Sequence, residues 1–75
     1  MTETDDRILG LLRTNGPMTV RHIVEVYQIA YGYIDAHKVY YSLWRMTDKR
    51  LVRKAGTQAR AIRWGKDPDL FEAIE

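Results

Sequence analysis

The chain has 75 residues, of which 45% are hydrophobic and 29% charged, with no cysteine and a formal net charge of +2. This length allows one small domain of ordinary globular composition, and the lack of cysteine excludes disulfides and a cysteine-based zinc site. No apolar run approaches the ~18 residues of a membrane span, and residues 1–6 lack the features of a signal peptide, so we expect a cytoplasmic protein with no membrane partner.

Two helices are predicted in the first half of the chain. The first begins near Thr2 or Thr4 and ends at Gly16, which suits the left-handed position that follows many helices. The second begins at Thr19, a favourable N-cap, and stops at Gly32. The first turn of the first helix carries Asp5 and Asp6, which suit the helix dipole. Apolar residues recur at helical spacing at Ile8, Leu11, Leu12, Val20, Ile23, Val24 and Tyr27.

A third helix is predicted over residues 35–48, with two chemically different faces. At 100° per residue, one stripe faces the core and consists of Ala36, Val39, Leu43 and Met46, with Tyr40 at its margin. The opposite side combines aromatic and basic groups, namely His37, Lys38, Tyr41, Trp44 and Arg45. Trp44 lies toward one edge of this side. Surface helices more often carry Glu and Lys there, so this face is the informative one.

The last third of the chain predicts a β-hairpin followed by a short helix. Residues 51–55 and 61–64 are predicted strands joined by residues 56–60. Asp67 and Pro68 suit the N-cap and first position of a helix, whose apolar face would consist of Leu70, Phe71 and Ile74. The expected class is α+β, with a domain over residues 1–66 and a helical tail over residues 67–75.

Positive charge is concentrated in one part of the chain. Residues 35–66 contain nine basic and two acidic residues and carry +7, whereas the remaining residues carry −5. An asymmetry of this kind favours a polyanionic partner for the basic part.

The order of helix, turn, helix, turn, helix and basic hairpin resembles a winged helix-turn-helix domain over residues 5–64. The segments that carry the resemblance are "KVYYSL", "KRLVRKAG" and the closing Trp64, and residues 17–19 lie where such domains often place a small first strand. The pattern "VYYSL…RLVRKAGT…W" is also similar to Z-form nucleic-acid-binding winged helices, in which a tyrosine and a tryptophan at the places of Tyr41 and Trp64 contact the backbone. His37 and Tyr33 depart from that subgroup, as does the absence of paired prolines, so its activity is not carried over.

The resemblance implies binding of double-stranded DNA, with the third helix in the major groove and the hairpin over residues 51–64 as a basic wing. Lys38 and Arg45 would donate to guanine, while His37 and Tyr41 would bond bases or phosphates. The start of the second helix, with Thr19 and Arg21, would bind a phosphate. Arg53, Lys54 and Arg60 would follow the backbone from the wing, or Arg60 would enter a minor groove. Trp64 would close the sheet as a core residue.

Other functions are weighed against DNA binding. A winged helix that binds proteins without touching DNA is the main alternative, and the tail could pack on its own domain or form a homodimer through Leu70, Phe71 and Ile74. An enzyme is not expected, because Ser42 is the single serine and nothing supplies a nucleophile, base and orienter. His22 and His37 lack a supporting ligand pattern, so we expect no metal, cofactor or small-molecule substrate. By analogy, the chain is expected to be a transcriptional regulator of the small prokaryotic or phage type.

Overall fold

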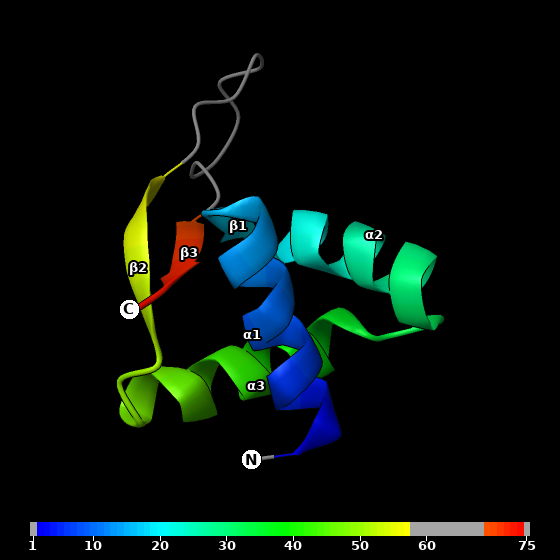
Figure 1. Cartoon of the computed structure of the whole chain (residues 1–75), viewed down its shortest axis with the longest axis horizontal. Coiled ribbons are helices and arrows are strands. Elements are labelled where there is room, and N and C mark those ends of the chain that lie inside the picture. Colours follow the sequence, from blue (N-terminus) through cyan, green and yellow to red (C-terminus); the bar gives the residue numbers. More distant parts are fainter. Residues whose placement is uncertain (1, 58–68, 75) are drawn as a thin grey trace.

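The computed structural model describes residues 2–57 and 69–74 and contains three helices and three strands (Figure 1). In chain order they are α1 (Glu3–Asn15), β1 (Met18–Thr19), α2 (Val20–Tyr31), α3 (Ala36–Asp48), β2 (Val52–Thr57) and β3 (Asp69–Ala73). The α+β class and the three predicted helices are confirmed. The predicted strand over residues 61–64, with Arg60 and Trp64, lies outside the described residues. None of the helices described is long and apolar enough to cross a membrane.

The helix boundaries follow from local capping. The side chains of Thr2, Thr19 and Asp35 each accept a hydrogen bond from a backbone N–H in the first turn of the helix that follows, at 3.2, 3.1 and 2.9 Å. Helices α1 and α2 end at Gly16 and Gly32, whose φ angles of +79° and +104° disfavour residues with a Cβ. Both stop signals and all three N-caps are therefore encoded locally.

Gly10 in α1 and Gly16 at its C-terminal end should respond in opposite ways to substitution by alanine, as judged by the free energy of unfolding. Gly10 lies inside α1, and a Cβ there meets no atom within 4 Å, so Gly10→Ala should raise the free energy of unfolding by about 0.5–1 kcal/mol. Gly16 also has open space, but its backbone has φ +79° and ψ −160°, so Gly16→Ala should lower the free energy of unfolding by about 1–3 kcal/mol. Urea denaturation measures both. Equal effects would contradict the backbone assigned to Gly16.

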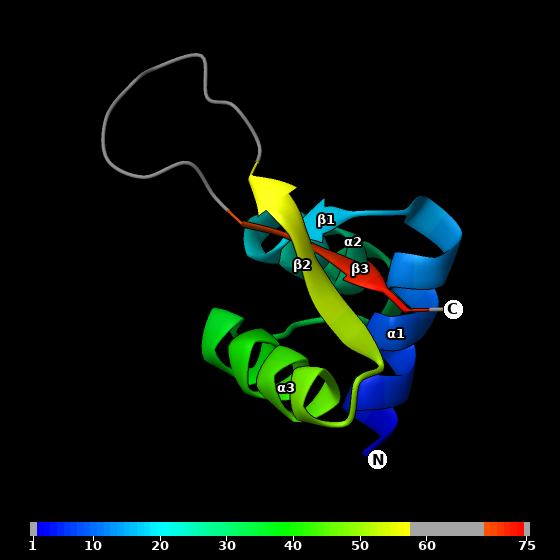
Figure 2. The same cartoon turned by 90° about the vertical axis from the view of Figure 1, so that its left-hand side faces the viewer.

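The strands form one antiparallel sheet in the order β1-β3-β2, so the last strand in sequence is the central one (Figure 2). The prediction of a helix in the tail is therefore wrong over residues 69–73. Leu70, Phe71 and Ile74 have a spacing that a helix would tolerate. However, a strand here receives backbone partners from both β1 and β2, and it turns Phe71 into the core. The small first strand expected at residues 17–19 is present as β1.

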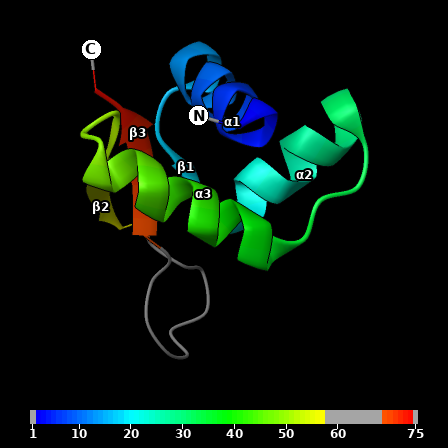
Figure 3. The same cartoon turned by 90° about the horizontal axis from the view of Figure 1, so that it is seen from below.

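The core lies between the three helices and one face of the sheet. Its buried apolar residues include Ile8, Leu12, Met18, Ile23, Tyr27, Val39, Leu43, Met46, Val52 and Phe71. Figure 3 shows α3 crossing the molecule beneath α1, with β2 and β3 beside its C-terminal half. On α3 the predicted stripe is correct for Val39, Leu43 and Met46, whereas Ala36 is exposed and Ser42 is fully buried.

Candidate nucleic-acid interface

Exposed residues cover the side of α3 that turns away from the core, and five of them make up what we call the α3 face: His37, Lys38, Tyr40, Tyr41 and Trp44. Tyr41 and Trp44 are 58% and 66% exposed, so the tryptophan belongs to the surface rather than to the core. Their rings meet edge to face, with 6.3 Å between centroids and an angle of 81°. An exposed aromatic pair held in one geometry offers apolar area at low entropic cost.

Three hollows lie in a row across α3 and share residues of the α3 face. The first, about 310 Å³, lies between the start of α1 and α3 and is lined by Thr2, Thr4, Lys38, Tyr41 and Arg45. The second, about 290 Å³, is lined by His37, Tyr40, Tyr41 and Trp44. The third, about 390 Å³, joins Tyr40 to Arg21 of α2 and to Asp69 and Phe71 of β3. Because Tyr41 lines the first two and Tyr40 the last two, one continuous surface connects α1, α3, α2 and the outer end of the β2–β3 pair.

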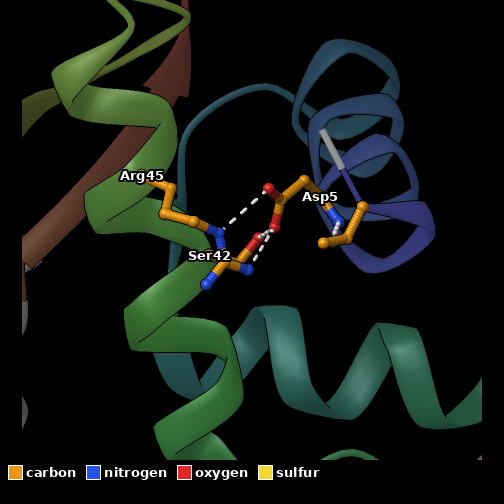
Figure 4. A network of polar contacts seen from close by, with 4 residues as sticks. Asp5, Ser42 and Arg45 are labelled. Atoms are coloured by element: carbon orange, nitrogen blue, oxygen red, sulfur yellow. Dashed lines mark hydrogen bonds and ion pairs between the residues drawn. The ribbon is translucent and has the colours of Figure 1, made fainter.

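Arg45, predicted to read a base, is held by a carboxylate from α1 (Figure 4). Its Nε donates to Asp5 Oδ2 at 3.2 Å and its Nη2 to Asp5 Oδ1 at 2.8 Å, while Ser42 Oγ also donates to Asp5 Oδ1. Asp5 is 1% exposed, whereas the side chain of Arg45 is 47% exposed. Bidentate donation to guanine would require Arg45 to give up this pairing, so the geometry disfavours base reading by Arg45.

The same contacts change the acidity of Asp5. Burial by itself raises the pKa of this carboxyl group, but hydrogen bonds from Arg45 and Ser42 and the charge of Arg45 outweigh it and lower the pKa from 3.8 to about 2. The carboxylate therefore stays ionised at neutral pH although it is almost fully buried. Asp5 acts as a fixed anchor between α1 and α3.

The concentration of positive charge seen in the sequence is partly neutralised in space. Arg45 pairs with Asp5, Arg53 with Glu72 at 2.5 Å, and Lys54 with Asp69 at 3.2 Å. All three acidic partners come from outside residues 35–66. Within the ranges 2–57 and 69–74, Lys38 has no acidic partner. Over those same ranges, no three His, Asp or Glu side chains are grouped to hold a metal ion.

The remaining predicted residues divide into exposed and structural ones. His37, Lys38 and Tyr41 are exposed on α3, and Arg21 is exposed beside Glu25, with 3.4 Å between the charged atoms. Thr19 is only 5% exposed, and its hydroxyl accepts the backbone N–H of His22, which leaves little of it for a ligand. Thr19 is thus the N-cap that sets the start of α2, as the sequence also indicates.

Several residues of this surface were missed by sequence reasoning. Tyr40 lay at the margin of the predicted core stripe, and a single helical wheel does not decide such a position. Asp5 suited the helix dipole and gave no sign of burial. Thr4 gave no signal beyond that of a helix start. Only the packing of α1 against α3, which brings together residues 37 to 40 positions apart, could reveal the first hollow.

Comparison with known proteins shows which fold this arrangement represents. No protein-family model and no curated protein matches the sequence. Bacillus subtilis PadR, solved in complex with operator DNA, is similar with a TM-score of 0.79 and 17% identity; the match covers 99% of this chain but only 41% of PadR. A HOP2 structure, described in terms of DNA recognition and protein interaction domains, has a TM-score of 0.69 and 17% identity over 93% of this chain and 97% of that one. The chain thus has the winged-helix fold, as the sequence predicts.

Proposed function

We propose that this chain is a sequence-specific double-stranded DNA-binding protein that regulates transcription, and not an enzyme. The observation that carries the proposal is the continuous surface across α3. The side chains of the α3 face are exposed and lie outside the core, and the surface reaches both the start of α2 and the β2–β3 pair. The likeness to PadR, a structure solved with operator DNA, supports the same use of the fold. We place such a regulator in the cytoplasm.

In this proposal α3 enters the major groove with the α3 face toward the bases. Each base pair presents a distinguishable set of donors, acceptors and methyl groups there. His37 and Lys38 supply polar contacts, while Tyr41 and Trp44 supply apolar contacts that suit thymine methyl groups. Arg21, Arg53 and Lys54 follow the phosphate backbone, with Arg53 and Lys54 acting from the wing after exchanging their carboxylate partners for phosphates. Arg60 belongs to the same proposed group.

Salt dependence tests the proposal directly. If about four phosphates are neutralised, the logarithm of the affinity should fall with a slope of roughly −3.6 against the logarithm of salt concentration. Binding to random-sequence duplexes should then weaken about 150-fold between about 50 and about 200 mM salt. Fluorescence anisotropy with labelled duplexes measures this slope, and selection from a randomised pool should enrich one motif. No binding at low salt, or enrichment of no motif, would contradict the proposal.

A protein-interaction module without DNA binding is the second candidate, and one observation favours it. Ile29 and Tyr33 are among the most exposed large apolar side chains described, at 87% and 86%, and they lie outside the α3 face. Contact through such residues would change little with salt, which separates it from DNA binding. A homodimer remains part of the proposal. Phe71 lies in the core of its own domain, so that contact would rest on Ile74 and the half-buried Leu70.

A further inference from the structure

The hollow between the start of α1 and α3 has the chemistry of an anion site. It is lined by two residues with cationic side chains, Lys38 and Arg45, together with three residues that carry a hydroxyl group, Tyr41, Thr2 and Thr4. It has a volume of about 310 Å³ and is lined by residues of two different helices. No other hollow among those described over residues 2–57 and 69–74 combines two cations with three hydroxyl groups.

The charges at this hollow fit an anion of charge −1. Lys38 and Arg45 bring two positive charges, and Asp5 brings one negative charge that is already bound by Arg45 and Ser42. The remaining charge is +1, which matches one phosphodiester. Asp5 also fixes the direction of Arg45, because it binds both Nε and Nη2. The guanidinium is therefore held at the rim of the hollow before any ligand arrives.

The hollow lies on the flank of α3 opposite to the wing, which decides which DNA backbone it would face in the major groove. With 100° per residue, Lys38 and Arg45 point about 140–180° away from Ala36 and Tyr40, which line the hollow on the wing side. Figure 3 shows α3 running between the N-terminal end of α1 and the outer ends of β2 and β3. An α-helix about 10–12 Å across nearly fills a major groove about 12 Å wide, so its two flanks face the two opposite backbones.

We propose that this hollow binds a backbone phosphate of duplex DNA on the side of the major groove opposite to the wing, through Lys38, Arg45 and the hydroxyl groups of Tyr41 and Thr4. The inference rests on the proposed function and adds a contact that sequence reasoning did not contain. Lys38 and Arg45 then serve as phosphate ligands that set the register of α3, instead of contacting base edges. Contacts of this kind position a protein on the duplex without selecting sequence.

A matched pair of substitutions on one helix tests the site. Thr4→Glu places a carboxylate in the hollow, whereas Thr14→Glu adds the same charge to the exposed far end of α1. We expect Thr4→Glu to weaken binding to any duplex about 10-fold or more, and Thr14→Glu to weaken it less than about 2-fold. Thermal unfolding verifies that both variants fold. Lys38→Gln should reduce the steepness of the salt dependence by about 0.9, the loss of one phosphate contact.

The possible outcomes separate this inference from the proposed function. If the wild-type chain binds DNA but Thr4→Glu and Thr14→Glu weaken it equally, the phosphate site is wrong while DNA binding stands. If Lys38→Gln keeps the salt dependence of the wild-type chain, the phosphate site is also wrong while DNA binding stands. If the wild-type chain binds no duplex, both the proposed function and this site are overturned. A selective loss with Thr4→Glu, equal across unrelated sequences, supports the site.

Discussion

Replacing Asp5 with alanine is expected to lower the free energy of unfolding by about 2–4 kcal/mol. The substitution leaves the buried Ser42 hydroxyl without its acceptor and removes the partner of two Arg45 nitrogens. The effect should stay below that of a fully buried ion pair, because Arg45 is half exposed and can turn to water. For a domain of this size the melting temperature should fall by about 10–30 °C, measurable by circular dichroism.

The neighbouring Asp6 is the control for Asp5, since it is exposed in the same helical turn. Asp6→Ala should cost no more than about 0.5 kcal/mol, and a similar loss in both variants would contradict the anchoring role of Asp5. The pH dependence gives a second test. Because the pKa of Asp5 is lowered from 3.8 to about 2 in the folded state, its contribution of about 2 kcal/mol is present above pH 4. It should be lost as the pH falls toward about 2, and Asp5→Asn should not show that loss.

Replacing Tyr41 with alanine is expected to weaken DNA binding about 10-fold to 100-fold with little change in folding. Tyr41 lines two of the three hollows, and its ring is held against Trp44. The substitution therefore removes apolar contact area, a hydroxyl group and the support of Trp44 together. Truncation of an aromatic anchor at an interface typically costs more than about 1 kcal/mol and often about 2 kcal/mol, which corresponds to this range. Titration of a labelled duplex with the wild-type and variant proteins measures it.

Tyr33 provides the matched control for Tyr41, because it is an exposed tyrosine that does not belong to the α3 face and lines none of the three hollows. Tyr33→Ala should change the dissociation constant less than about 2-fold. The variant Tyr41→Phe keeps the ring, so the difference between it and Tyr41→Ala separates ring contacts from those of the hydroxyl group. Equal losses for Tyr33→Ala and Tyr41→Ala would contradict the placement of α3 in the groove.

Local chemistry explains which features were predictable from the sequence. The three N-caps and the two glycine stops act within one helical turn, so their residue types announce the helix boundaries. The outward position of His37, Lys38 and Tyr41 also follows from helical periodicity alone. These elements, in this order, are sufficient to indicate the winged-helix fold.

The missed features depend on partners distant in sequence. The segment of β3 is short and its apolar spacing suits a helix, so pairing with β1 and β2 decides its conformation. Asp5 looks like an ordinary first-turn carboxylate until α3 supplies Ser42 and Arg45. The salt bridges of Arg53 and Lys54 likewise depend on the register between β2 and β3. The charge of +7 counted over residues 35–66 therefore overstates the positive charge of the corresponding surface, because acidic residues from other segments pair with it.

The central place of β3 has a consequence for the order of events in the cell. Strands β1 and β2 border β3 on opposite sides, and Met18 is paired with Phe71 across 53 positions of sequence. During synthesis the helices can form while the chain is still emerging, but the sheet of β1, β3 and β2 cannot assemble until residues 69–73 have left the ribosome. The slowest step of folding should therefore be the pairing of β3 with β1 and β2, since closing the long loop between β1 and β3 is costly in entropy.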